Sequence, residues 1–173
     1  SRPASLLGTF ATRRPPDPPL RRDVRICTPA DRAGSPICVI DPKKIAGVVF
    51  TDLADESGGF DEPTAVTDQI GQNVADFLAC EMRSGRIPKQ FLPLQSGVGN
   101  IANAVLAALG QSRDIPAFEM YTEVLQDSVS PLLENGRCTF ASTCALTLSP
   151  DAMHKVIADI DYYKKRIVLR PQE

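Results

Sequence analysis

The chain has 173 residues, which allows one domain with a sizeable core. Its 43% hydrophobic and 23% charged residues are typical of a globular protein and exclude a disordered one. The formal net charge of −2 gives no electrostatic basis for binding nucleic acid or an anionic membrane surface, and no apolar stretch approaches the roughly 20 residues of a spanning helix. We therefore expect no nucleic-acid partner and no membrane association.

The cysteines do not suggest a metal site. They are odd in number, scattered and without a CxxC pair, and the chain has a single histidine, His154. We therefore predict no zinc or other metal centre. Reduced thiols in an intracellular compartment are the default interpretation.

Residues 1–27 differ in composition from the rest. Residues 1–25 hold six arginines and two aspartates, and the prolines at positions 15, 16, 18 and 19 exclude a regular helix. We interpret this stretch as an extended connector. The alternative is a mitochondrial presequence, which is Arg-rich and poor in acids. The proline cluster and the missing start methionine argue against that alternative.

Two short strands and a helix are predicted next. Turn signals bracket a strand at residues 37–40, and the apolar run at residues 45–50 predicts a second, buried strand. Residues 64–83 predict an amphipathic helix that ends before Gly85. Its expected buried stripe comprises Val66, Ile70, Val74, Phe77, Leu78 and Met82.

The chain is organised around residues 91–126. An apolar run at 91–94, predicted as a strand, leads into a glycine turn. A buried helix is expected at 100–109, and a second strand at 118–121 stops at Thr122-Glu123. In open α/β sheets, ligands bind outside the carboxyl ends of the strands. The pattern therefore predicts that the turn and the Glu123 carboxylate share one edge of a sheet.

The glycine turn is suited to a ligand that offers oxygen atoms. Gly97 and Gly99 let the backbone approach closely, and the helix behind them directs N–H groups at the same point. Ala102 occupies the third glycine position of the dinucleotide fingerprint, which excludes that motif. By spacing alone, a tight strand–helix turn beside a surface acid is the simpler interpretation.

The remaining elements continue the alternation. We expect a short helix at 128–135, a strand at 138–148 with a bend near Ser142, a helix capped by Ser149, and a last strand at 167–169. The whole pattern predicts an α/β fold with an open, mostly parallel sheet and flanking helices.

Two literal motifs are more specific than the spacing. LQSGVGNIANAVL at 94–106, followed by YTEVLQD at 121–127, resembles the acetyl-CoA hydrolase/transferase family. These are class I CoA-transferases and include succinyl-CoA:acetate CoA-transferase. The resemblance covers roughly residues 28–171. It implies that residues 28–173 are an internal fragment, part of the second α/β domain of a longer, homodimeric protein of mitochondria or cytoplasm.

The resemblance also implies a function. Glu123 matches the family's nucleophile, which forms a glutamyl-CoA thioester, and a CoA loop maps onto Gly97, Val98, Gly99, Asn100, Ile101 and Ala102. The implied substrates are an acyl-CoA, such as acetyl- or succinyl-CoA, and a small carboxylate such as acetate, or water. CoA thioester is then a substrate, and no cofactor is bound permanently. Two alternatives stay open: a non-catalytic CoA- or nucleotide-binding module, and a structural half-domain.

Overall fold

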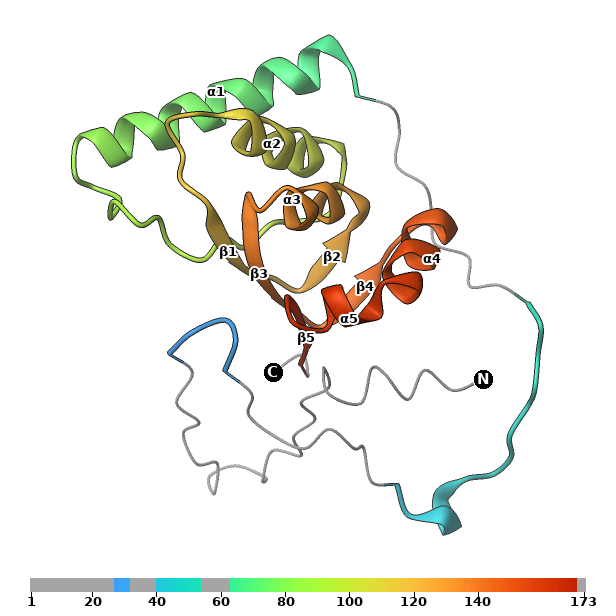
Figure 1. The fold of residues 1–173 in the computed structure, drawn as a ribbon. Helices are drawn as coiled ribbons and strands as arrows, with labels where there is room; N and C mark the ends of the chain where they lie inside the picture. Colours follow the sequence, from blue (N-terminus) through green and yellow to red (C-terminus); the bar gives the residue numbers. More distant parts are fainter. Residues whose placement is uncertain (1–26, 32–39, 54–62, 171–173) are drawn as a thin grey trace.

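The computed structural model describes residues 27–31, 40–53 and 63–170. Its helices are η2 (Pro42–Lys44), α1 (Ala65–Arg83), α2 (Asn100–Gln111), η3 (Asp127–Val129), α3 (Ser130–Glu134), α4 (Pro150–Ala158) and α5 (Ile160–Tyr163). Its strands are β1 (Phe118–Tyr121), β2 (Val124–Gln126), β3 (Cys138–Thr143), β4 (Ala145–Thr147) and β5 (Ile167–Leu169). The predicted α/β class with open sheets is confirmed (Figure 1).

Within the described residues, all strand pairs are parallel. One sheet has the order β1-β3-β5, and a smaller one pairs β2 with β4. Tyr121 pairs with Ser142 in the first sheet and Val124 pairs with Ala145 in the second. The segment β1–β2 and the neighbouring segment β3–β4 are therefore interrupted at the same level. The bend predicted near Ser142 therefore falls at the break between β3 and β4, at Cys144, beside the break between β1 and β2, at Thr122 and Glu123.

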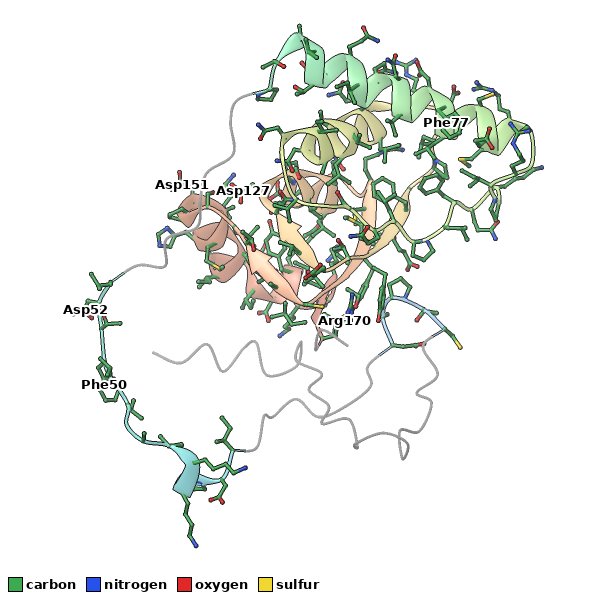
Figure 2. All side chains as sticks on the ribbon, turned by 180° about the vertical axis from the view of Figure 1, so that it is seen from behind. Phe50, Asp52, Phe77, Asp127, Asp151 and Arg170 are labelled. Carbon is green, nitrogen blue, oxygen red and sulfur yellow. The ribbon has the colours of Figure 1, made fainter. Side chains whose placement is uncertain are left out.

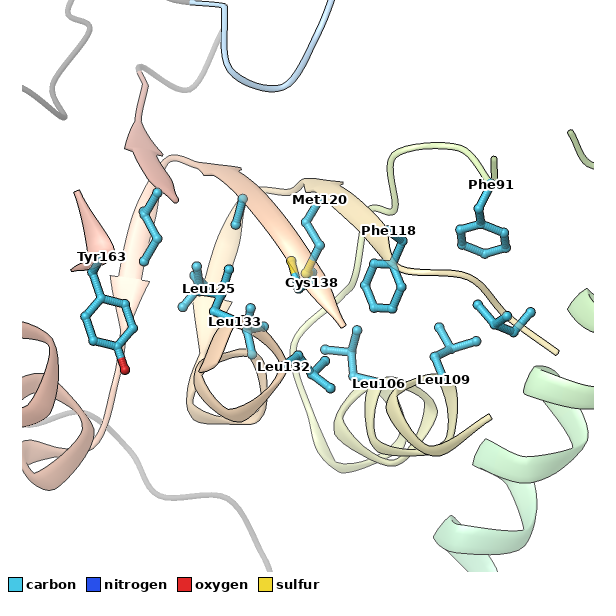
Figure 3. Packing of buried hydrophobic residues seen from close by; sticks show 14 of the residues in the cluster. Phe91, Leu106, Leu109, Phe118, Met120, Leu125, Leu132, Leu133, Cys138 and Tyr163 are labelled. Carbon is cyan, nitrogen blue, oxygen red and sulfur yellow. The ribbon is translucent and has the colours of Figure 1, made fainter. Parts of the chain in front are cut away.

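The core lies between the first sheet and two helices. Leu106 and Leu109 of α2 point toward the sheet, where Phe118 and Met120 of β1 lie, and Leu132 of α3 lies beside Leu106 (Figure 3). Helices α2 and α3 cover one face of the sheet, and α1 lies outside α2 (Figure 1). This packing anchors the helix that begins at the glycine turn.

Helix α1 has the predicted length, and its expected stripe is confirmed in part: Ile70, Val74, Leu78 and Met82 are half-buried, but small residues occupy the centre of the buried face. Its buried residues are Gly71, Ala75 and Ala79, whereas Val66 and Phe77 of the expected stripe are 69% and 62% exposed. A Cβ at Gly71 would lie 2.5 Å from the Ala104 carbonyl oxygen, so α1 and α2 are in close backbone contact. Only small residues permit that approach, and this contact outweighs the larger apolar side chains.

Two predicted strands are absent. In residues 45–50, Val49 and Phe50 are 89% and 93% exposed, and Figure 2 shows Phe50 on an extended segment away from the core. Residues 91–94 form only a single bridge, between Leu94 and Met120, because Phe91 has a φ of 58° that a strand does not accommodate. The connector and the strand expected at 37–40 lie essentially outside the described residues.

Candidate active site

The glycine turn, residues 96–99, leads directly into α2. Gly99 precedes the helix with a φ of 125° and a ψ of 175°, a conformation open essentially to glycine alone. The helical hydrogen bonds begin where the Asn103 N–H donates to the Gly99 carbonyl at 3.0 Å. The N–H groups of Ile101 and Ala102 precede that first bond, as at any helix N-terminus.

The chain that enters the turn runs beside β1. The Leu94 N–H donates to the Glu119 carbonyl at 2.8 Å, and the Tyr121 N–H donates to the Leu94 carbonyl at 3.0 Å. These bonds form the parallel bridge between Leu94 and Met120. The turn and the segment that carries Glu123 therefore leave the sheet at the same edge, as the sequence predicts.

Two buried polar side chains connect that segment to the turn. Thr122, which is 0% exposed, donates from Oγ1 to the Ser96 carbonyl at 3.0 Å and accepts from the Ser96 N–H at 3.4 Å. Gln126, which is 1% exposed, donates from Nε2 to the Gly97 carbonyl at 2.9 Å and accepts from the Gly99 N–H at 3.4 Å. We call Thr122 and Gln126 the brace. They lie on either side of Glu123.

Glu123 follows the C-terminal end of β1, as the sequence predicts, and it lies in a short break before β2, a strand that the sequence did not predict. Its carbonyl oxygen accepts from Thr143 Oγ1 at 2.9 Å, from the Cys144 N–H at 2.8 Å and from the Ala145 N–H at 3.1 Å. The residue itself is exposed. Its backbone is thus fixed while its side chain is accessible to a substrate.

Arg170 fixes the peptide that precedes Glu123. Its Nη2 donates to the Thr122 carbonyl at 2.8 Å, and its Nη1 lies 3.0 Å from Cys144 Sγ. Burial raises the pKa of the Cys144 thiol, the positive charge of Arg170 lowers that pKa, and the negative charge of Glu123 raises it. The charges of Arg170 and Glu123 therefore both act on the same sulfur.

The predicted CoA-loop residues form one continuous turn and helix start. Val98 and Ile101 are 61% and 53% exposed, so apolar surface lies at the turn. His154 is exposed on α4. Among the described residues, no three His, Cys, Asp or Glu side chains gather as metal ligands, and no helix is long and apolar enough to cross a bilayer.

Sequence reasoning missed the brace and Arg170. One signal was available for the brace, since Gln126 is the polar residue of the short strand β2 and Thr122 directly follows β1. A polar side chain that is buried in a strand requires a partner. No local signal marked Arg170, because its partners are 26 and 48 residues away in the sequence.

No protein-family model matches the chain. It is 52% identical over 159 residues to the propanoyl-CoA:succinate CoA transferase of Escherichia coli (strain K12) and 40% identical over 157 residues to an acetyl-CoA hydrolase of Schizosaccharomyces pombe. It is 37% identical over 157 residues to a succinyl-CoA:acetate CoA-transferase of Clostridium kluyveri. These matches take in 91% to 92% of this chain but only 29% to 32% of each relative. The resemblance to the acetyl-CoA hydrolase and CoA-transferase enzymes is confirmed, and the chain spans about a third of their length.

Proposed function

We propose, from this similarity to one segment of acetyl-CoA hydrolases and CoA transferases, that the protein transfers CoA from an acyl-CoA to a carboxylate or hydrolyses the acyl-CoA. In this proposal Glu123 is the nucleophile and residues 97–102 bind CoA. Residues 28–173 then form part of the second domain of a longer protein, which we expect to be homodimeric. The donors in the proposal are acetyl- or succinyl-CoA, and acetate is a representative acceptor.

The first half-reaction uses the carboxylate directly. A Glu123 oxygen attacks the thioester carbonyl carbon, the C–S bond breaks, and an acyl-glutamyl anhydride and the CoA thiolate form. The thiolate then attacks the glutamyl carbonyl carbon, the bond between that carbon and the bridging oxygen breaks, and the donor leaves as a carboxylate that keeps the bridging oxygen. Glu123 is left as its CoA thioester.

The second half-reaction repeats these steps in reverse order with a new carboxylate. The acceptor attacks the glutamyl thioester carbon and releases CoA thiolate, which takes the acyl group from the new anhydride and regenerates the Glu123 carboxylate. When water attacks the anhydride or the thioester instead, the net reaction is hydrolysis. A carboxylate is a weak nucleophile, so all of these steps require close positioning and stabilised oxyanions.

The turn has the properties that CoA requires. Glycines at 97 and 99 admit the ligand close to the backbone, and α2 directs the N–H groups of Ile101 and Ala102 at the same point. The exposed side chains of Val98 and Ile101 offer apolar contact for the pantetheine arm. Asn100 adds an amide side chain at the first position of the helix.

The observation that carries the proposal is the brace, since it holds the strand break at Glu123 against the glycine turn. The test uses the protein encoded by the complete gene. We expect the wild type, incubated with acyl-CoA, to form an adduct at Glu123 that borohydride reduces and hydroxylamine releases. Glu123→Gln should abolish the adduct and turnover while CoA binding persists.

The competing function is a CoA-binding module without catalysis. It predicts that wild type and Glu123→Gln bind CoA equally and that neither forms an adduct. Turnover that survives in Glu123→Gln would instead show that another group is the nucleophile. Either result would contradict the role assigned to Glu123.

A further inference from the structure

We infer that Thr122 and Gln126 are positioning residues that turn two backbone N–H groups of the glycine turn, those of Gly97 and Val98, toward an oxygen atom of the acyl-CoA. The inference rests on the proposed function, since it needs the turn to face the substrate of Glu123. It adds a specific task for two side chains and identifies the two donors that they orient.

The two side chains of the brace, Thr122 and Gln126, are buried completely, and a buried polar group costs free energy unless it is hydrogen-bonded. An apolar residue of similar size would fill either position without that requirement. Both side chains hydrogen-bond to backbone carbonyls of the turn. The same carbonyls also accept local bonds, from Gln95 Nε2 at 3.1 Å and from Ser96 Oγ at 3.3 Å, but only Thr122 and Gln126 reach them from the buried side.

The hydrogen bonds of the brace also set the direction of two peptide groups in the turn. A trans peptide is planar, so its C=O and N–H point in opposite directions. Thr122 Oγ1 draws the Ser96 carbonyl inward, which points the Gly97 N–H of the same peptide outward. Gln126 Nε2 draws the Gly97 carbonyl inward, which points the Val98 N–H outward.

The outward-pointing N–H groups face an open surface. Gly97 is exposed with no atom within 4 Å of a Cβ placed there, and Val98 is 61% exposed. Two adjacent N–H groups that face an open surface form a small site for an oxygen that carries negative charge. In an acyl-CoA that oxygen belongs to the thioester carbonyl or to a phosphate.

The amide of Gln126 also sets the direction of the next peptide. Its Oε1 accepts from the Gly99 N–H, so the Val98 carbonyl of that peptide points away from Gln126. One side chain thus fixes the peptides on both sides of Val98. Because Glu123 lies between Thr122 and Gln126, residues 122–126 carry the nucleophile and also hold the two N–H donors of the turn.

The test compares isosteric variants in the protein encoded by the complete gene. Thr122→Val and Gln126→Met keep the volume and remove the hydrogen bonds, whereas Thr122→Ser keeps the hydroxyl. The matched control is Ser128→Ala, which removes the 2.8 Å bond from Ser128 Oγ to Asn103 Oδ1 of α2 but leaves the glycine turn untouched. Steady-state kinetics with acyl-CoA and thermal unfolding are measured for each.

We expect kcat/KM for acyl-CoA to fall about 10- to 100-fold in Thr122→Val and Gln126→Met, because small displacements of groups at a reacting centre cause losses of this size. Thr122→Ser and Ser128→Ala should stay within about threefold of the wild type, the size of a minor hydrogen-bond loss. A fall in kcat assigns the donors to the thioester oxygen, and a rise in KM assigns them to a phosphate.

Three results would overturn the inference. The first is a loss of kcat/KM in Thr122→Val and Gln126→Met no larger than in Ser128→Ala, and the second is an equal loss in Thr122→Ser and Thr122→Val. The third is a loss of activity in these variants that is explained entirely by a loss of folded protein. If Gln126→Met does not fold, the comparison of Thr122→Ser with Thr122→Val decides. Failure of the proposed function is distinct, because it appears as retained turnover in Glu123→Gln, whatever the brace variants do.

Discussion

The guanidinium of Arg170 lies over the ring of Tyr121, with its Cζ 3.9 Å from the ring centroid. Arg170 follows β5, and Tyr121 ends β1, so the contact spans the sheet from one edge strand to the other. The same guanidinium donates to the Thr122 carbonyl. The stack and the hydrogen bond together fix the chain immediately before Glu123.

We predict that Arg170→Lys lowers kcat about tenfold, because an ammonium reproduces neither the planar stack nor the two directed donors. The measurement is steady-state turnover of acyl-CoA together with the melting temperature. Arg166→Lys is the matched control. Arg166 lies 3.7 Å over the Tyr162 ring and donates to the Tyr162 carbonyl at 3.1 Å, far along the chain from Glu123. Equal losses of kcat in the two variants would contradict a local role for Arg170.

A second prediction concerns the contact of α1 with α2. Gly71→Ala would place a Cβ 2.5 Å from the Ala104 carbonyl oxygen, a backbone atom that cannot move aside as a flexible side chain would. We expect a loss of about 1–3 kcal/mol in the free energy of unfolding, even though alanine favours a helix by about 1 kcal/mol. Urea denaturation measures it.

Gly110→Ala provides the comparison for Gly71→Ala. There the nearest atom is Leu132 Cδ2 at 2.4 Å, the far end of a flexible side chain that can adopt another rotamer. The loss should therefore be smaller than at Gly71. A Gly71→Ala protein as stable as the wild type would mean that α1 and α2 are not held this closely.

A third prediction concerns the C-terminal end of α2. Arg137 Nη2 donates to the carbonyls of Leu109, Ser112 and Ile115 at 2.9, 2.9 and 2.7 Å, so one side chain gathers the helix end and the loop after it. Arg137→Met should lower the free energy of unfolding by about 2–3 kcal/mol, because part-buried carbonyls lose a charged donor. Chemical denaturation is the measurement.

Arg83→Met is the control for charge alone. Its salt bridge with Asp114, at 2.9 Å, joins side chains that are 63% and 66% exposed. Exposed pairs contribute about 0–1 kcal/mol, so this variant should be nearly as stable as the wild type. A similar loss in both arginine variants would show that general charge, and not the bonds of Arg137, stabilises the fold.

The sequence predicted those elements that depend on local pattern. The strands Phe118–Tyr121 and Ile167–Leu169 have the predicted bounds, and Ser149 caps α4 by accepting from the Ala152 N–H at 3.3 Å. Capping and strand patterns involve neighbours in the chain, so a single sequence contains them. The shared edge of the glycine turn and Glu123 followed from the general geometry of parallel sheets.

The remainder depends on contacts between distant residues. The buried face of α1 is set by Gly71 against Ala104, 33 positions away, and the apolar run that contains Phe50 lacks a described partner surface to bury it. The strand break at Glu123 lies beside the break at Cys144 in the neighbouring strand, so it is a property of the pair of strands. No pattern within either strand alone contains that information.

The last prediction is a pH dependence that originates at Cys138. Burial raises the pKa of this thiol from 9.0 to about 12. Between those pH values the thiol is deprotonated in the unfolded chain and protonated in the folded chain, so unfolding releases a proton. Raising the pH through this window therefore destabilises the fold by up to about 1.4 kcal/mol per pH unit. Urea unfolding of the wild type and Cys138→Ala at pH 8.5, ~9.5 and ~10.5 measures the difference.

We expect Cys138→Ala to be less stable than the wild type at the lowest pH, because it leaves a cavity at a completely buried site. The difference in the free energy of unfolding between the two proteins should narrow as the pH rises. Val168→Ala, a buried truncation on the edge strand β5, removes no titratable group and should show a constant gap. All other high-pH titrations are common to the three proteins and cancel in the differences. A constant gap for Cys138→Ala would mean that the thiol ionises alike in the folded and unfolded chains, and water would then have to reach Cys138 beneath α2 and α3.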